Sequence, residues 1–185
     1  MKKTISFLSI LILSVLFVAC QNRNQSGTSM NDTTMYKDTS KIAQDSDFLN
    51  AAAEGGMMMV QMGKMAQQKA TSKDIKGFGN MMISDHSEVD NELRSLAQKN
   101  DINLPDTLNK DKQDKISDLA KLSGKKFDKQ YVDMMVDDHQ NDVDKFKDEA
   151  QNASSPQVRQ WAAKTLPTLQ KHLNKIKDIQ KKYNY

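Results

Sequence analysis

One short pattern occurs twice in this chain and constrains its fold more than any other feature. Met81-Met82-Ile83-Ser84-Asp85-His86 returns 53 residues later as Met134-Met135-Val136-Asp137-Asp138-His139. Around each copy, large apolar side chains recur every three or four residues, which is the spacing of one face of an α-helix. The sequence therefore predicts two similar amphipathic helices, each with a histidine on the face that packs inward.

Start and stop signals predict the remaining helices. Ser46-Asp47 is a cap before an apolar series, Ser72 starts a second helix, and Pro156 suits the first turn of the last one. Gly55-Gly56 interrupts the first helix, and we expect it to allow close approach by a neighbouring helix or a local bulge. In chain order, the predicted helices cover residues 46–69, 72–99, 108–122, 126–152 and 156–183.

These helices predict an all-α fold. No segment alternates between apolar and polar residues for long enough to suggest a sheet. Four amphipathic helices of about 25 residues, with one longer crossover between the second and third, are typical of a four-helix bundle. The short helix at residues 108–122 is then an extra helix within that crossover.

The first twenty residues predict export and lipid attachment. Lys2 and Lys3 precede an uncharged segment, Ile5 to Ala19, with the length of a signal-peptide core. The segment ends in Leu16-Phe17-Val18-Ala19-Cys20, which resembles a bacterial lipoprotein box and contains the only cysteine. We expect residues 1–19 to be a lipoprotein signal peptide and Cys20 to carry the membrane anchor. The alternative is an ordinary signal peptide followed by a chance cysteine.

Residues 20–45 are predicted to be a flexible tether, and residues 46–185 the bundle domain. From Gln21 to Gln44 the chain is almost entirely polar, so it cannot bury enough apolar surface to fold. Gln21 in place of an acidic residue resembles lipoproteins sent to an outer membrane. The expected location is therefore the bacterial envelope, at the outer membrane and facing the periplasm.

Composition excludes two classes of protein. At 37% hydrophobic residues, the chain is too polar for an integral membrane bundle. The 27 basic residues are nearly balanced by 24 acidic ones, so no basic surface indicates a nucleic-acid partner. Contact with the membrane is expected only through Cys20.

All three histidines, His86, His139 and His172, lie on inward faces near the midpoints of their helices. Because midpoints of packed helices of similar length meet, we expect the imidazoles to share one layer. The first helix would add a thioether or a carboxylate at the same height. Bundle proteins build metal sites from such side chains. The candidate metal ligands are His86, His139, His172, Met58, Met59 and Glu54.

The choice between thioether and carboxylate bears on the identity of the ion. Three imidazoles with Met58 or Met59 favour copper, whereas three imidazoles with Glu54 suit iron, zinc or manganese. Asp85 and Asp138 point away from the histidine on their own helix, but each is placed to orient a histidine of an adjacent helix. The hypothesis is one transition-metal ion, copper, zinc or iron.

The alternative is a buried polar layer without any ligand. In that interpretation the imidazoles hydrogen-bond to Asp85, Asp90, Asp138 or Asp142 and fix the helix register. No phosphate-binding loop, Cys–His pair or Ser–His pair supports another chemistry, so we assign no catalytic residue. A redox enzyme with an iron pair would require several interior carboxylates, and only Glu54 is suitably placed.

The domain resembles the bacterial domain-of-unknown-function 4142 family, which is grouped with ferritin-like bundles. The resemblance implies an exported, ferritin-like four-helix bundle of undefined activity. Family members commonly carry glutamate where this chain has Met59, and an acidic residue where it has Gln61, which shifts the hypothetical site toward softer metals. The resemblance rests on Phe48-Leu49, Ala52, Gly55-Gly56, Gly63-Lys64-Met65-Ala66, Met82-Ile83-Ser84-Asp85-His86, Glu92-Leu93, Leu104-Pro105, Leu122-Ser123-Gly124, Phe127-Asp128, Tyr131, Asp138-His139, Leu166-Pro167-Thr168-Leu169 and His172-Leu173.

Two functions therefore remain open from sequence. The first is a lipid-anchored envelope protein whose helical bundle binds a transition metal through a histidine layer at mid-bundle. The second is a non-catalytic structural or interaction module of the envelope, in which the same histidines are core polar groups.

Overall fold

The structure is a computed structural model that describes residues 31–185, with side chains from residue 43 onward. The predicted signal peptide and Cys20 lie outside the described residues. Within residues 31–185 every regular element is helical, as predicted. The helices are α1 (Asn31–Lys69), α2 (Lys73–Lys99), α3 (Lys110–Ala120), α4 (Gly124–Asn152) and α5 (Pro156–Tyr183). None of these described helices combines the length and apolar character needed to cross a membrane.

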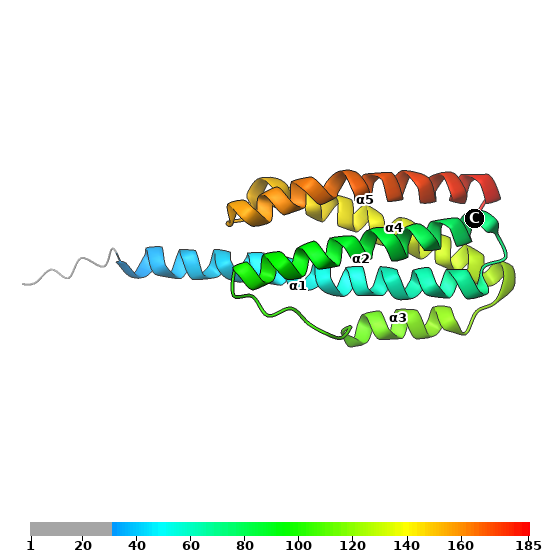
Figure 1. Cartoon of the computed structure of the whole chain (residues 1–185), viewed down its shortest axis with the longest axis horizontal. Coiled ribbons are helices and arrows are strands. Elements are labelled where there is room, and N and C mark those ends of the chain that lie inside the picture. Colours follow the sequence, from blue (N-terminus) through cyan, green and yellow to red (C-terminus); the bar gives the residue numbers. More distant parts are fainter. Residues whose placement is uncertain (1–30) are drawn as a thin grey trace, which may run out of the picture.

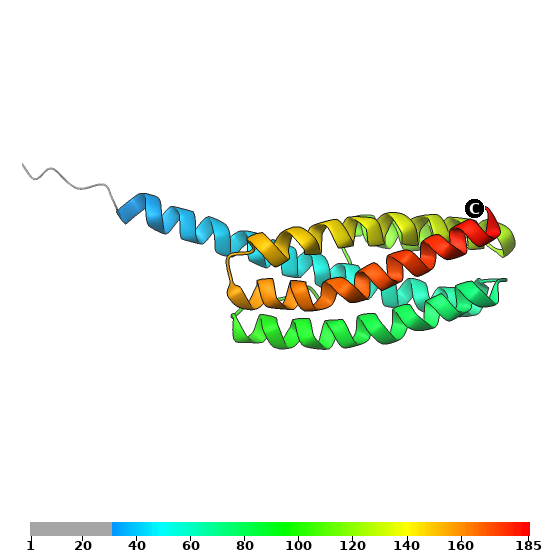
Figure 2. The same ribbon diagram turned by 90° about the horizontal axis from the view of Figure 1, so that it is seen from above.

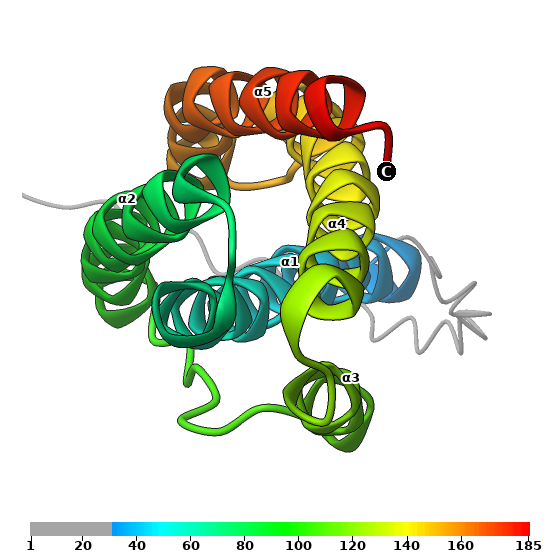
Figure 3. The same ribbon diagram turned by 90° about the vertical axis from the view of Figure 1, so that its right-hand side faces the viewer.

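Two antiparallel hairpins form the bundle. α1 pairs with α2, α4 pairs with α5, and these are the two most extensive helix contacts. Figures 1 and 2 show the four long helices running side by side. Viewed along the bundle in Figure 3, α1 neighbours α4 and α2 neighbours α5, while α3 lies outside the ring against α1 and α4. The crossover from α2 to α4 thus brings a short fifth helix onto one side.

The first helix begins earlier than predicted. α1 starts at Asn31, not near Ser46, so the prediction of an unfolded tether is wrong for residues 31–44. Extending an existing helix by one residue adds a hydrogen bond without a new nucleation cost. The polar residues before Ser46 therefore continue a helix whose later part is held in the bundle.

Buried aspartates fasten the turn of each hairpin to the neighbouring hairpin. Asp128 of α4 is fully buried and accepts hydrogen bonds from the backbone N–H groups of Thr71 and Ser72, at 3.0 and 3.2 Å. At the opposite end, Asp45 accepts from the N–H groups of Ser154 and Ser155, at 2.8 and 2.7 Å. These bonds satisfy backbone donors at the starts of α2 and α5, and they fix the hairpins relative to each other.

The close approach of α1 and α2 occurs at Gly63 and Gly79, not at Gly55-Gly56 as predicted. A Cβ added to Gly63 would lie 2.7 Å from the carbonyl oxygen of Gly79, and one on Gly79 would lie 2.8 Å from that of Gly63. By contrast, a Cβ on Gly55 or Gly56 meets nothing within 4 Å. Glycine is required at the first pair because two backbones touch there.

Two apolar clusters fill the interior, one toward each end of the bundle. One is rich in methionine and includes Met59, Met82 and Met135. The other is aromatic, with Phe48, Phe146 and Trp161 in mutual contact at ring-centroid distances of 5.0 to 5.8 Å. Along α2 and α4, a histidine separates residues of one cluster from residues of the other. On α5, His172 lies next to Leu173 of the aromatic cluster and one turn before Ile176 of the methionine-rich cluster.

Candidate metal centre

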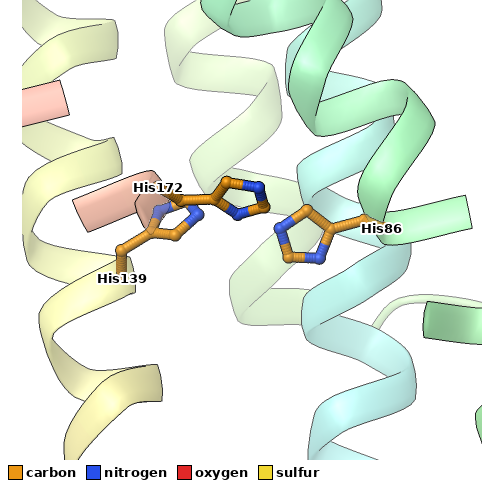
Figure 4. A group of neighbouring side chains, drawn as sticks. All are labelled: His86, His139 and His172. Carbon is orange, nitrogen blue, oxygen red and sulfur yellow. The ribbon is translucent and has the colours of Figure 1, made fainter. Parts of the chain in front are cut away.

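Three helices bring one imidazole each to the middle of the bundle. His86 of α2, His139 of α4 and His172 of α5 are 5%, 0% and 0% exposed. Their ring centroids form a nearly equilateral triangle, with sides of 5.8, 5.3 and 5.4 Å. Figure 4 shows the three rings turned toward one another. Each ring contributes one nitrogen atom to a set of three that all lie within 4.8 Å of one another, so a single ion can reach all three.

Hydrogen bonds fix which nitrogen His139 and His172 present. Nδ1 of His139 lies 2.8 Å from the carbonyl oxygen of Met135, one turn earlier in α4. Since a carbonyl only accepts, Nδ1 carries the proton and Nε2 keeps its lone pair. Nε2 of His172 lies 2.8 Å from Asp85 Oδ2, so Nε2 donates and Nδ1 keeps its lone pair.

Those free nitrogens have no partner within the part of the chain that the structure describes. His139 Nε2, His172 Nδ1 and His86 Nε2 are all buried without a hydrogen bond. A buried polar atom left unpaired costs roughly 1 to 3 kcal/mol. Three such atoms in one cluster are the arrangement that a shared metal ion would satisfy.

Burial keeps the three rings uncharged at neutral pH. It lowers the pKa of His139 to about 4, with a further contribution from His172. Burial also holds the pKa of His86 well below its ordinary value, and the other two imidazoles add to the effect. The pKa of His172 is lowered by burial as well, against the opposing influence of Asp85. Neutral imidazole is the form that binds metal, so no proton competes near pH 7.

The structure places Asp85 beside a histidine of a different helix. The carboxylate projects from α2 and holds His172 of α5 at 2.8 Å. Among the described residues, no other hydrogen bond joins a carboxylate to an imidazole. Asp90, Asp138 and Asp142 make no such bond, so of the four carboxylates named in the polar-layer alternative Asp85 alone contacts an imidazole. A carboxylate that accepts from the far nitrogen orients an imidazole and increases its basicity toward a metal.

Glu54 and Asp138 face α3 instead of the imidazoles. Glu54 Oε2 accepts from Lys112 Nζ at 3.1 Å and also from the side chain of Asn109. Asp138 Oδ1 pairs with Lys115 Nζ at 3.3 Å. The predictions that Glu54 ligates the ion and that Asp138 orients a histidine therefore find no contact here. Sequence reasoning did not anticipate that α3 would pack over this side and supply lysines.

Met58 and Met59 are buried in the methionine-rich cluster, at 3% and 1% exposure. Phe78 of the same cluster contacts the rings of His139 and His172 edge-on, at 5.9 and 6.4 Å between centroids. The methionines thus belong to the apolar wall on one side of the histidine layer. The Phe78 ring borders two of the imidazoles, and the polarizable sulfurs of the methionines lie in the same cluster as Phe78.

A family match covers residues 30–179 and has the description "Domain of unknown function (DUF4142)". This chain belongs to the DUF4142 family. The resemblance inferred from sequence motifs is therefore confirmed. No curated protein sequence matches the chain.

Solved structures of similar fold include two copper- or silver-binding forms of one protein. "CopM in the Cu(I)-bound form" is 18% identical, with a TM-score of 0.63, and the match covers 75% of this chain and 96% of that one. "CopM in the Ag-bound form (by co-crystallization)" gives a TM-score of 0.61 at the same identity and coverage. A DUF305 fragment from Deinococcus radiodurans is 10% identical, with a TM-score of 0.66, and the match covers 75% of this chain and 96% of the fragment. At these identities the likeness shows a common helical-bundle fold.

Proposed function

We propose that this protein binds one soft monovalent metal ion, Cu(I), through His86, His139 and His172. The observation that carries the proposal is the convergence of three buried, unpartnered imidazole nitrogens within 4.8 Å of one another. Each comes from a different helix, so the folded bundle holds the three ligands in place before the ion arrives. Binding then costs little side-chain ordering.

The local charge favours a monovalent ion. The three rings are neutral, and Asp85 on His172 supplies one negative charge next to them. An ion of charge +1 gives a neutral centre, whereas a divalent ion would leave excess charge in a buried site. Uncompensated charge in a protein interior is costly. Glu54 would have offset a second charge, but Lys112 already pairs with it.

The surroundings also favour a soft ion. Met82 and Met135 lie one helical turn before His86 and His139 and belong to the methionine-rich cluster. Iron, manganese and zinc sites usually include carboxylate or thiolate ligands as well as imidazoles. CopM, whose fold this chain shares, has been solved with Cu(I) and with Ag bound, which supports the same class of ion here.

The place of action is part of this proposal. The lipoprotein box at Cys20 and the polar segment after it support a domain anchored to the bacterial envelope by lipid, at the outer membrane and facing the periplasm. The ferritin-like character of the bundle also belongs here, and the two antiparallel hairpins joined by a crossover support it. Copper binding in such a place would serve to buffer or sequester the metal.

Anaerobic titration of the purified protein with Cu(I), against a coloured Cu(I) chelator, tests the proposal. We expect one ion per chain, with Zn(II) and Fe(II) binding more weakly. His139→Ala should lower the Cu(I) affinity by more than the roughly 100-fold that loss of an outer partner costs. The matched control is Tyr131→Phe, which removes a buried, unpartnered hydroxyl two turns away on α4 and should leave the affinity unchanged. Equal affinities in wild type and His139→Ala would contradict the proposal and leave a purely structural polar layer.

A further inference from the structure

A small cavity lies directly beside the histidine layer. It has a volume of about 20 Å³, and all four long helices contribute to its walls. A cavity of roughly 10 to 15 Å³ is enough to hold one water molecule. His86 forms part of the wall, so this imidazole belongs both to the cavity and to the histidine layer. The lining also includes Gly55, Gly56, Asp90, Asp142 and Thr165.

The cavity exists because two glycines face it. Gly55 and Gly56 are half-buried residues of α1 that line the cavity, and nothing lies within 4 Å of a Cβ built on either one. Glycine in a helix interior costs about 1 kcal/mol relative to alanine. No close backbone contact or positive φ requires glycine at these positions. The open volume beside His86 is thus the structural consequence of having glycine there.

Polar side chains stand among mainly apolar residues in the cavity wall, which also includes Leu93, Phe146 and Leu169. Asp90 is one of the polar residues, and its Oδ1 is buried without a partner among the described residues. Thr165 is 3% exposed, and its side chain is also part of the wall. Burial raises the pKa of Asp142 to about 7, so this carboxyl carries its proton in a large share of molecules near neutral pH. A protonated carboxyl can donate a hydrogen bond as well as accept one.

We infer that this cavity is the binding position of a small exogenous ligand of the metal ion, a neutral molecule of one or two heavy atoms. The inference rests on the proposed function, because it needs an ion in the histidine layer. Three protein ligands plus an open position is the arrangement of reactive metal centres, whereas structural centres are closed by a fourth side chain. Here the position beside His86 is closed by no side chain of the described chain, since Gly55 and Gly56 offer none.

Size and charge define the class of ligand. The cavity has room for a single water or a diatomic molecule. Anions are disfavoured, because the lining contains no positively charged side chain to compensate a buried negative charge. Hydrogen-bonding groups on the wall favour a ligand that can accept or donate. Water and diatomic gases fit this description, while halides and carboxylates do not.

Carbon monoxide is the probe that tests the inference, because it is diatomic, neutral and a ligand of Cu(I). The Cu(I)-loaded protein is exposed to carbon monoxide, and binding is followed by the infrared stretching band of the bound molecule. We expect a single sharp band in wild type. In Gly55→Ala/Gly56→Ala the added methyl groups enter the cavity, so carbon monoxide affinity should fall by about tenfold or more. Cu(I) affinity should stay the same.

The matched control is Gly77→Ala. Gly77 is an exposed helical glycine of α2 that also has nothing within 4 Å of a built Cβ, so the substitution changes helix propensity without touching the cavity. It should leave both affinities unchanged. A second arm, Asp142→Asn, should shift the infrared band, because Asp142 lies on the cavity wall.

The possible failures are distinguishable. A protein that binds Cu(I) but gives no carbon monoxide band overturns the inference and leaves the proposed function intact. The same holds if Gly55→Ala/Gly56→Ala binds carbon monoxide as wild type does. If Cu(I) itself does not bind, both the proposed function and this inference are wrong.

Discussion

Two groups of polar side chains lie inside the same bundle and are neutralised in different ways. On the side covered by α3, the carboxylates of Glu54 and Asp138 pair with lysines that α3 supplies, at 3.1 and 3.3 Å. In the histidine layer, no side chain of the described residues satisfies the three inward-facing nitrogens. The protein therefore carries its own cations on one side and a set of unused ligands on the other.

This difference shows how a bundle separates structure from binding. The ammonium groups of the α3 lysines are part of the protein itself. The carboxylates of Glu54 and Asp138 therefore need no bound cation from solution to balance their charge. The imidazole layer carries no formal charge, and none of the described groups donates a hydrogen bond to its three free nitrogens. Asp85, the carboxylate in contact with it, lies on the far nitrogen of His172. A mobile cation completes such a layer without disturbing the rest of the core.

Acidification should have the largest effect, because burial disfavours the protonated form of more than one imidazole in the histidine layer. Burial lowers the pKa of His139 to about 4 from an ordinary value of 6.5, so between these values the unfolded chain binds more protons than the folded one. The metal-free protein should lose stability as pH falls through this window, by up to about 1.4 kcal/mol per pH unit for each such imidazole. His86, whose pKa is also well below normal, adds to the loss. Urea unfolding between pH 4 and 7 measures this, and stability that does not fall on acidification would contradict it.

The carboxyl groups partly oppose that loss. Burial raises the pKa of Asp142 to about 7 from 3.8, so the folded state holds the extra proton in between and gains stability as pH falls. Asp142→Asn removes this opposing contribution. The variant should therefore lose stability more steeply than wild type in the same acid series.

Removing the charge on the imidazole side should have the next largest effect. Asp85→Asn keeps an acceptor for His172 but removes the negative charge that offsets the ion. Cu(I) affinity should fall by about 10- to 100-fold, as it does when an outer carboxylate partner of a metal-bound histidine is lost. Asp138→Asn is the control, because this carboxylate pairs with Lys115 and not with an imidazole. Equal Cu(I) affinities of the two variants in the chelator competition would show that Asp85 has no role at the centre.

Removing a cation from α3 should have the smallest effect and should change stability alone. Lys112→Met leaves the Glu54 carboxylate, which is 17% exposed, without its partner. The free energy of unfolding should fall by about 1 to 2 kcal/mol, between the values for exposed and buried pairs. Adding Glu54→Gln should restore much of the loss, and Cu(I) affinity should not change.

The exposed pair Lys110–Asp114 on the same helix provides the control. Lys110→Met should cost less than about 1 kcal/mol, because exposed ion pairs contribute little. Chemical denaturation of the wild type and the three variants gives all these values. A change in Cu(I) affinity in Lys112→Met would show that the two sides of the interior are coupled.

Much of the fold could be predicted from sequence. The cap at Ser72, the end of α2 at Lys99 and the start of α5 at Pro156 lie where the signals indicated. The start of α1 could not be predicted, because local polarity does not show that a bundled helix continues outward to Asn31. Likewise, the sequence does not show which glycines of α1 and α2 lie where the two helices touch. The structure places Gly63 and Gly79 at that contact and not Gly55 or Gly56.

The amino-acid pattern alone was enough to predict which faces of the helices point inward and that His86, His139 and His172 lie at similar heights. Helical periodicity and helix length are properties of each segment alone, so both can be read along the chain. Three features became known from the folded bundle: Asp85 holds His172, Lys112 holds Glu54, and a cavity opens beside His86. Those contacts depend on how each helix is rotated and shifted against its neighbours, and such relations between segments leave no periodic trace in the sequence.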